Sequence, residues 1–226
     1  MDYIKRKIIT EDGSITYRID DLKENYHSLY GAVTESYFVY LNEGLNYWFQ
    51  KRNQCECNIL ELGYGTGLMA YMSFVESNKI RKSIDYTSLE PFPMTTEETK
   101  ILKYDKFFDS SYISMNFKKF SSIIWEQAQD LSPYFRIVKK QTCFENFKSQ
   151  NYFDIIFYDA FGYNAQPELW EPHLMRKCFE LLNPGGVWVS YCAKGSVRRG
   201  LKKAGFKVFR LPGPPGKREM LRAVKE

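Results

Sequence analysis

The sequence predicts an α/β fold with a mostly parallel, seven-stranded sheet, and three observations support this prediction. Residues 58–62 form an apolar strand pattern that runs into a glycine loop and then into a helical segment, which is the order of a βα unit. Residues 153–159 are nearly continuously apolar, as is typical of a strand covered on both faces. Residues 206–210 and 220–224 flank a rigid Pro/Gly turn, so the last strand should run antiparallel within this sheet.

An N-terminal hairpin and helical region precede this core. Residues 8–17 predict a short hairpin in which Asp12-Gly13 supplies the turn. Residues of about 22–50 carry apolar side chains at helical spacing and predict one or two helices that cap the sheet and could form a lid. We therefore expect a cap over residues 1–50 and a core over residues 51–226, together forming one structural domain.

The remaining elements follow from periodicity and from their stop signals. Pro167 favours a helix start, the sequence Asn183-Pro184-Gly185-Gly186 favours its end, and Gly205 closes the next helix. We expect further strands at 83–90, 135–138 and 187–192, and helices at 68–75, 95–102, 117–130, 167–182 and 196–204.

Charge is distributed unevenly along the chain. The net charge is +5, but from Lys194 onward there are 11 Lys or Arg against 2 Asp or Glu. Such asymmetry suggests a polyanionic partner, although a solvated basic helix face explains the charge equally well.

The chain has no long apolar segment and no secretory signal. No stretch approaches the roughly 20 apolar residues that cross a bilayer, and residues 1–7 lack the apolar region of a signal peptide. We therefore expect a cytoplasmic protein without a membrane partner. The five cysteines, Cys55, Cys57, Cys143, Cys178 and Cys192, have poor spacing for zinc, which favours reduced thiols and no metal site.

The glycine loop carries the clearest signal for a ligand. Gly63, Gly65 and Gly67 allow the backbone to approach a ligand, and a helix N-terminus follows them. A dinucleotide fingerprint needs its third glycine one position later, where this chain has Leu68, so NAD is disfavoured. The pattern Glu-x-Gly-x-Gly-x-Gly with Glu90 placed 23 positions after the last glycine resembles the S-adenosylmethionine signature of Rossmann-like methyltransferases. A tight strand-to-helix turn without a ligand is the alternative.

Asp159 ends the strand at 153–159 and is the candidate catalytic residue. A primary alkylamine has a pKa of about 10 and must lose a proton before it can accept a methyl group. A carboxylate at this strand end can orient the ammonium and accept that proton. Alternatively, Asp159 only caps the following loop. Phe161 either stacks on a base or fills the core.

The chain resembles the MnmC methyltransferase family over nearly its whole length. The resemblance rests on the glycine loop and on several motifs, of which the last two are the most specific: Asp12-Gly13-Ser14, Tyr26-His27-Ser28, Gly31-Ala32, Glu35-Ser36, Ser88-Leu89-Glu90, Asp159-Ala160-Phe161, residues 166–170 (QPELW), residues 191–195 (YCAKG) and residues 211–220 (LPGPPGKREM). It implies a Rossmann-like, class I fold and methylation of the 5-aminomethyl group of a wobble (2-thio)uridine in tRNA, giving 5-methylaminomethyl.

The resemblance also implies partners and site residues. A separate enzyme would supply the aminomethyl precursor, DNA is not a partner, and neither the flavin of the fused oxidase found in some bacteria nor a metal is expected, because 226 residues leave no room for that oxidase. The implied S-adenosylmethionine site comprises Tyr26, Glu35, Ser36, Glu61, Gly63, Gly65, Thr66, Gly67, Glu90, Pro91, Cys143 and Asp159. The implied tRNA contacts are Phe161, Lys194, Arg198, Arg199, Lys217 and Arg218.

Two positions depart from the family pattern. Cys143 stands where the family usually has an acid near the adenine, with Glu145 nearby. Gly162-Tyr163 replaces a small residue and Pro after the Asp-Ala-Phe motif. Adenine recognition and the loop shape beside the target base therefore differ from the family pattern.

Two other functions use the same residues. A small-molecule amine methyltransferase or an aminopropyltransferase-like enzyme would need the same pocket without the basic C-terminal segment. A non-catalytic module that binds S-adenosylmethionine or RNA would keep the glycine loop without turnover.

Overall fold

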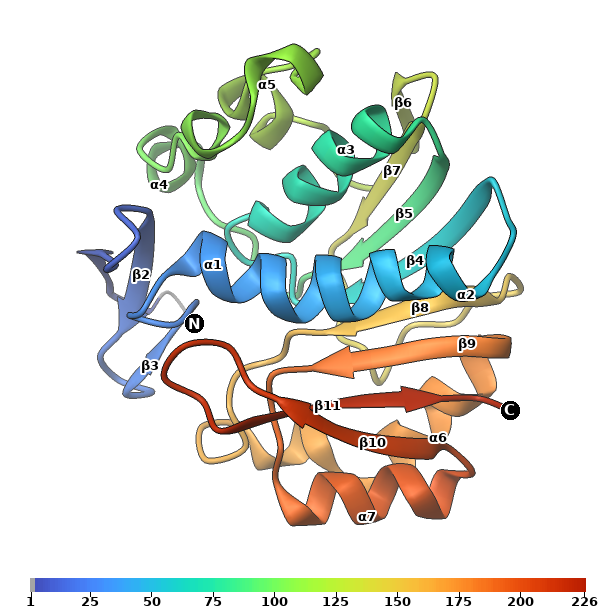
Figure 1. Ribbon diagram of the computed structural model, residues 1–226. Helices are drawn as coiled ribbons and strands as arrows, with labels where there is room; N and C mark the ends of the chain where they lie inside the picture. The colour runs from blue at the N-terminus through green and yellow to red at the C-terminus, as the bar shows by residue number, and fades with distance from the viewer. Residues whose placement is uncertain (1–2) are drawn as a thin grey trace.

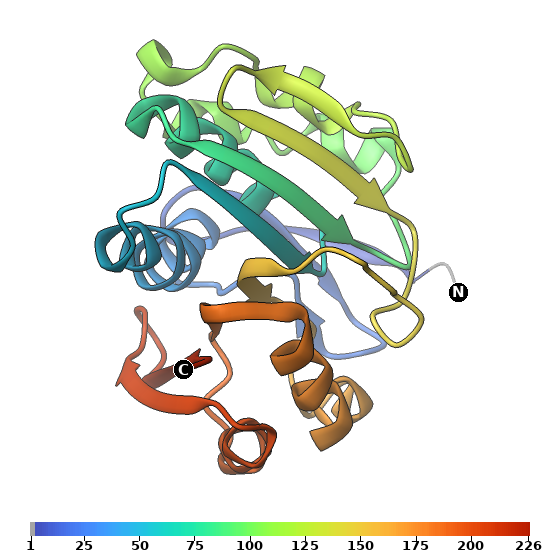
Figure 2. The ribbon, with the colours of Figure 1, turned by 90° about the vertical axis from the view of Figure 1, so that its right-hand side faces the viewer.

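The computed structural model describes residues 3–226, which form an eight-stranded sheet with helices on both faces and a small N-terminal sheet (Figure 1, Figure 2). The order in the large sheet is β10-β11-β9-β8-β4-β5-β7-β6. Its strands are β4 (Glu56–Leu62), β5 (Ser83–Leu89), β6 (Gln129–Ser132), β7 (Phe135–Lys140), β8 (Phe153–Tyr158), β9 (Leu182–Ser190), β10 (Lys207–Pro212) and β11 (Glu219–Val224). The predicted α/β class is confirmed, and so is the antiparallel last strand, because β11 pairs antiparallel with both β10 and β9.

Two hydrophobic cores lie on opposite faces of the sheet, because side chains alternate along each strand. On β8, Ile155 and Phe157 face one core while Ile156 and Tyr158 face the other. The first core lies under α1 (Ala32–Ser36), the π-helical segment η1 (Tyr37–Asn46), α2 (Tyr47–Lys51), α3 (Leu68–Ile80) and α5 (Phe117–Ser121). The second lies under α6 (Pro172–Leu181) and α7 (Gly195–Ala204). Short turns complete the chain: α4 (Thr96–Lys100), η2 (Tyr104–Phe107), η3 (Ser110–Tyr112) and η4 (Pro167–Trp170).

The N-terminal segment forms a three-stranded sheet followed by one long helix. Strands β1 (Lys5–Ile9) and β2 (Ile15–Ile19) make the predicted hairpin, and β3 (Glu24–Asn25) pairs with β2. Helical structure starts only at residue 32, so the prediction of helix from about residue 22 is wrong at its start. The helix then continues to residue 51 as α1, η1 and α2, and η1 packs on β8, β9 and β11.

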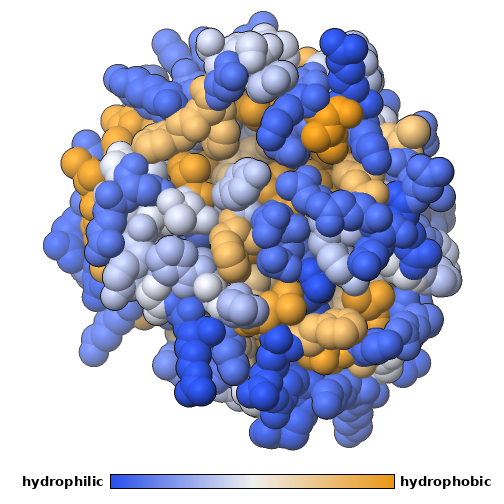
Figure 3. All heavy atoms as spheres, in the orientation of Figure 1, coloured by the Kyte–Doolittle hydropathy of each residue, from blue (hydrophilic) through white to orange (hydrophobic). Residues whose placement is uncertain are grey.

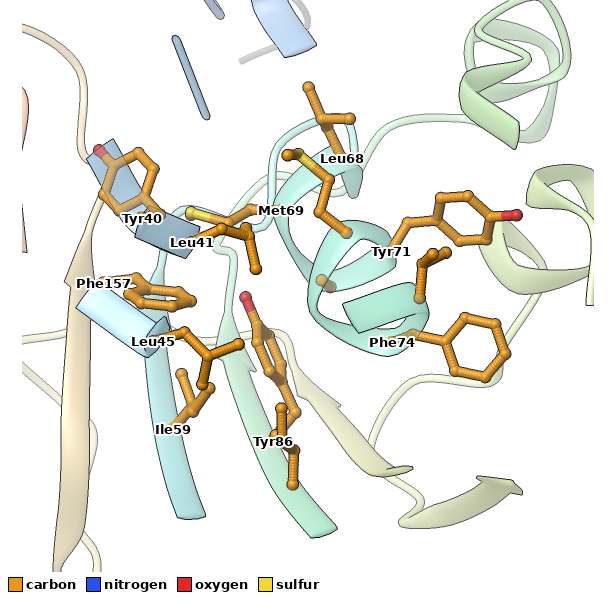
Figure 4. Close-up of a cluster of buried hydrophobic side chains, with 14 of the residues drawn as sticks. Tyr40, Leu41, Leu45, Ile59, Leu68, Met69, Tyr71, Phe74, Tyr86 and Phe157 are labelled. Atoms are coloured by element: carbon orange, nitrogen blue, oxygen red, sulfur yellow. The ribbon is translucent and has the colours of Figure 1, made fainter. Parts of the chain in front are cut away.

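Figure 4 shows how this helix covers the sheet. Tyr40, Leu41 and Leu45 from η1 lie over Ile59 of β4 and Phe157 of β8. All five side chains are at most 1% exposed, so this contact belongs to the main core.

The predicted helix over 117–130 is wrong beyond residue 121. Ser121 and Ser122 turn their hydroxyl groups back to the carbonyls of Lys118 and Lys119, a bonding pattern that competes with helix continuation. Glu126 then adopts a left-handed conformation with φ of 62°, which a continuing helix does not allow. The chain instead adds β6 as an edge strand, which is why the sheet has eight strands and not the predicted seven.

The predicted helix over 167–182 is divided into two elements. Residues 167–170 form the 3-10 turn η4, and α6 begins at Pro172, where proline is favoured in the first turn. Residues 183–186, predicted to be a stop sequence, lie within β9, which begins at Leu182.

Polar side chains cover most of the face of the molecule seen in Figure 1, and apolar residues appear there only in separate groups (Figure 3). Within residues 3–226, no helix has both the length and the apolar character that a membrane crossing requires.

We expect Gly44→Ala to destabilise the fold, because η1 approaches the sheet closely at this residue. A Cβ atom there would lie 2.9 Å from Phe157 Cε1 and 3.1 Å from Val189 Cγ2. Overpacking costs about 1–3 kcal/mol, and the better helix propensity of Ala returns up to about 1 kcal/mol. Urea denaturation should therefore give a net loss of about 1–2 kcal/mol in the free energy of unfolding.

Gly195→Ala is the matched control, because a Cβ atom there meets only the flexible Arg199 side chain. We expect its free energy of unfolding to stay within about 0.5 kcal/mol of the wild type. Equal stability of the two variants would contradict the close packing described for η1.

Candidate active site

A cavity of about 600 Å³ lies at the carboxyl ends of the central parallel strands. Its floor is formed where β4 meets β8 on one side and β5 on the other, which is the topological switch point at which open α/β sheets bind ligands. The loops after these strands line the cavity at residues 61–66, 89–93, 141–145 and 158–161. Residues 24–28 and Lys217 add walls from the N-terminal sheet and from the loop between β10 and β11.

The glycine loop is held close to the end of β8. Gly63 has φ of 89°, and a Cβ atom at this residue would lie 2.6 Å from the carbonyl oxygen of Asp159. Gly65 has φ of 49° and lies against the ring of Tyr26. Both positions therefore require glycine, for conformation and for space. Thr66 is buried in the cavity wall, whereas Gly67 lies outside the lining and forms the N-cap of α3.

Glu90 connects the glycine loop to the end of β5. Its carboxylate accepts hydrogen bonds from the backbone N–H groups of Gly65 and Phe92, each at 2.9 Å. Burial raises the pKa of Glu90, and these two hydrogen bonds oppose the rise. Pro91 lines the cavity next to it.

Glu61 is a fully buried carboxyl group in the cavity wall. The Ser88 hydroxyl donates to its Oε2, while its Oε1 has no hydrogen-bond partner among residues 3–226. Burial raises the pKa of Glu61 to about 8. The free Oε1 can therefore accept a donor from a ligand in the cavity.

Asp159 lies beside the glycine loop, and its carboxyl group contacts the long helix. The hydroxyl of Tyr40, in η1, donates to Asp159 Oδ1 at 2.6 Å. The pKa of Asp159 is raised to about 7, mainly by burial and also by the charge of Glu35, while the Tyr40 hydrogen bond opposes the rise. The carboxyl group can therefore gain or lose a proton near neutral pH.

Residues 26–36 of the N-terminal segment add further side chains to the cavity lining. The ring of Tyr26 meets Phe161 edge-on, with 5.2 Å between the ring centroids. Glu35 and Ser36 are buried in the lining, and Glu35 Oε2 accepts a hydrogen bond from the backbone N–H of Ser28 at 2.8 Å. Cys143 also lines the cavity, and burial raises the pKa of its thiol.

The predicted tRNA contacts fall into two groups. Phe161 and Lys217 line the cavity. Lys194, Arg198, Arg199 and Arg218 lie outside it, and none of them forms an ion pair with a carboxylate in residues 3–226. Lys194 donates to Asn164 Oδ1 at 2.9 Å, beside the loop that follows Phe161. We call these four outer residues the basic rim.

Among the cavity residues that sequence patterns did not assign to a site are Glu24, His27, Tyr40 and Tyr191. His27 and Tyr191 lie within the motifs quoted above, which was the available signal for them. Glu24 and Tyr40 carry no local signal, because only the tertiary fold brings them to the strand ends.

Carboxyl groups dominate the charged lining of the cavity. Glu24, Glu35, Glu90, Glu145, Glu168 and Asp159 contribute to it, against the two lysines Lys5 and Lys217. Glu61 also lines the cavity, but its raised pKa keeps it mostly neutral at pH 7. Lys5 is paired with Glu98. Such an environment favours cationic ligands over anionic ones.

Comparison with known proteins identifies a matching family model, similar sequences and a similar solved structure. The family model described as "S-adenosyl-L-methionine-dependent methyltransferase" matches residues 112–226. The tRNA 5-methylaminomethyl-2-thiouridine biosynthesis bifunctional protein MnmC of Actinobacillus pleuropneumoniae serotype 5b is 26% identical, over 92% of this chain and 33% of that protein. The protein with the same name from Leptospira interrogans strain Fiocruz L1-130 is 26% identical over 95% of this chain and 34% of that protein. The chain thus spans about a third of the length of these relatives.

A crystal structure of MnmC2 from Aquifex aeolicus superposes with a TM-score of 0.80 at 21% identity, covering 98% of this chain and 70% of that chain. The two chains therefore share a fold, including the N-terminal segment and the C-terminal hairpin.

We expect Asp159→Asn to stabilise the protein at pH 8 and to leave its stability unchanged near pH 4. The pKa of Asp159 is raised from 3.8 to about 7 on folding, so ionisation costs folding free energy as pH rises through this window. Asn avoids that cost, and the gain at pH 8 should be on the order of 3 kcal/mol. Urea denaturation at the two pH values measures it.

The control is Asp21→Asn, which removes an exposed carboxylate away from the cavity. It should change the free energy of unfolding little at either pH. A loss of stability at pH 8 in the Asp159 variant would be incompatible with a costly buried carboxylate.

Proposed function

We propose that this chain, which belongs to the S-adenosyl-L-methionine-dependent methyltransferase family, acts on tRNA. The proposed reaction methylates the amine of 5-aminomethyl-(2-thio)uridine at the wobble position. The product would be 5-methylaminomethyl-(2-thio)uridine. The names of the bifunctional relatives support the substrate, because they describe 5-methylaminomethyl-2-thiouridine biosynthesis and this chain matches part of their length.

The observation that carries the proposal is the carboxylate-lined cavity to which Asp159 contributes. Both the sulfonium of the methyl donor and the protonated amine of the substrate are cationic, and they suit this lining. The basic rim lies outside the cavity, where a polyanion would bind.

The residues present fit S-adenosylmethionine. Gly63 and Gly65 keep the loop backbone in the cavity wall at positions where no larger side chain fits, and the cavity volume is within the roughly 300–1,000 Å³ of small-molecule sites. Glu90 would hold the ribose, Glu61 would accept a hydrogen bond, and Tyr26, Glu35, Ser36, Thr66, Pro91 and Cys143 would enclose the molecule, with Gly67 shaping the turn. When bound, the cofactor supplies an electrophilic methyl group on a sulfonium, and the reaction requires no flavin or metal.

The chemical role of Asp159 is to receive the proton of the amine. A substrate ammonium has a pKa of about 10, and a carboxylate whose pKa is about 7 accepts its proton more readily than one of ordinary pKa. The amine lone pair then forms the N–C bond while the C–S bond breaks with its electron pair on sulfur. Tyr40 keeps the Asp159 carboxyl group oriented toward the cavity through its hydrogen bond.

The proposed nucleic-acid contacts are with tRNA phosphates. Lys194, Arg199 and Arg218 are exposed and Arg198 is half-buried, which suits phosphate contacts that position a nucleotide without reading sequence. Phe161 lies in the cavity and would stack on the extruded base. We propose that the protein works in the cytoplasm, where a separate enzyme supplies the aminomethyl group.

The direct test is methyl transfer from labelled S-adenosylmethionine to tRNA from a strain that lacks this methylation, followed by nucleoside analysis. We expect label in 5-methylaminomethyl-(2-thio)uridine, and at least a hundredfold lower turnover for Asp159→Ala, because general base catalysis contributes about 10²–10⁴-fold. Asp21→Asn should keep wild-type turnover. Equal labelling of a free alkylamine would favour a small-molecule methyltransferase, and no transfer with retained cofactor binding would favour a binding module.

We expect the variant K194A/R198A/R199A to raise the apparent KM for tRNA and to flatten its salt dependence. Each lost phosphate contact lowers the slope of log affinity against log salt by about 0.7–0.9. Measurement of KM at several salt concentrations gives the slope directly.

The control removes three exposed lysines near α5, which lies far from α7 in Figure 1: K106A/K118A/K119A. It should leave both KM and the slope unchanged. Equal slopes for the wild type and the α7 variant would remove these residues from the tRNA contact.

A further inference from the structure

Lys217 lies in the cavity, although a contact with tRNA outside it was expected for this residue. Its side chain turns into the cavity from the loop between β10 and β11. Its ammonium group forms an ion pair with Glu35 and lies 3.7 Å from the ring centroid of Tyr191.

The groups around this ammonium are held in place by partners other than Lys217. Glu35 Oε2 is fixed by the backbone N–H of Ser28, at 2.8 Å. The Tyr191 hydroxyl donates to the carbonyl of Ala160, at 2.8 Å, next to Asp159. The box formed by Glu35 and the face of Tyr191 would therefore keep its shape if the lysine withdrew.

The box has the chemistry that recognises a primary ammonium. A carboxylate supplies a charge-assisted hydrogen bond and an aromatic face supplies a cation–π contact. Asp159 and Glu24 lie near enough for the charge of Lys217 to lower the pKa of both carboxyl groups. A lysine side chain and an aminomethyl group end in the same chemical unit, a primary ammonium on a CH₂ group.

A hydrogen-bonded turn between β10 and β11 carries Lys217. Its backbone closes through hydrogen bonds from Gly213 N to Arg218 O and from Lys217 N to Pro214 O. Gly216, with φ of 79°, lies against the ring of Tyr30 from the N-terminal segment. The lysine side chain itself is 31% exposed, so part of it already faces solvent.

We propose that Glu35 and the face of Tyr191 form the subsite that receives the ammonium of the substrate, and that Lys217 is a built-in occupant which the substrate displaces. This inference rests on the proposed function. Free amines must compete with Lys217 unaided, whereas tRNA offers phosphates that can hold the displaced lysine beside Arg218. The exchange would thus favour an amine attached to RNA over a small one.

The test measures binding of the nucleoside 5-aminomethyluridine to protein loaded with S-adenosylhomocysteine, with 5-hydroxymethyluridine as the neutral analogue. We expect K217M to bind the aminomethyl nucleoside at least tenfold more tightly than the wild type and the neutral analogue unchanged. The double variant K217M/E35Q should lose this gain. Unchanged or weaker binding of the aminomethyl nucleoside by K217M would overturn the proposal.

The matched control is K207M, which removes a lysine of the same hairpin from an exposed pair with Glu226. Its affinity for both nucleosides should stay within twofold of the wild type. A tenfold gain in this control as well would assign the effect to net charge and overturn the shared subsite.

A second measurement needs no variant. Saturating 5-aminomethyluridine should increase the reactivity of Lys217 toward an amine-selective reagent, because the ammonium leaves Glu35. Peptide mass spectrometry measures this reactivity relative to that of the exposed Lys207 in the same sample, which corrects for reagent consumed by the nucleoside amine. Unchanged or lower reactivity would contradict displacement. These readouts report binding, so a failure of methyl transfer to tRNA would leave them interpretable, and active transfer with no effect at Lys217 would reject the subsite alone.

Discussion

The cavity depends on the close approach of two strand ends. Gly63 follows β4 and lies so near the carbonyl of Asp159 that no side chain fits between them. This contact fixes the glycine loop and the Asp159 carboxylate relative to each other through backbone atoms. A backbone contact of this kind cannot slide as a side-chain contact can, so the donor and acceptor sides of the reaction keep one geometry.

The charged lining is held at a cost to stability. Glu61 and Asp159 both have raised pKa values because burial disfavours their ionised forms, and the single hydrogen bond to each carboxyl group only partly offsets this. Globular proteins have only about 5–15 kcal/mol of net stability, so such groups are tolerated when the rest of the core compensates. Here the compensation comes from two aromatic-rich cores, one on each face of the sheet.

Sequence patterns identified the parts of the fold that depend on local signals. The apolar run of β8, the glycine loop and the Pro/Gly turn before β11 each determine their own conformation, and the corresponding elements are present. The place of Tyr40 and Glu24 in the cavity could not be predicted, because their neighbours there are distant in sequence. Residues 117–130 gave a wrong helix because apolar spacing alone does not reveal the left-handed Glu126, which leaves Ile124 57% exposed. Lys217 was assigned to phosphate binding by its type, whereas its inward direction follows from the loop that carries it.

The strand order has a consequence for how the molecule is assembled. Strand β11 lies between β9 and β10, so β9 has no neighbour on that side until residues 219–224 have been made. The pair between Glu35 and Lys217 likewise joins positions 182 residues apart. Domains begin to fold as they emerge from the ribosome, but non-local pairings of this kind form late. The nascent chain therefore exposes an open sheet edge and an incomplete cavity until residues 217–224 have been made, and a ligand meets the closed cavity only after that point.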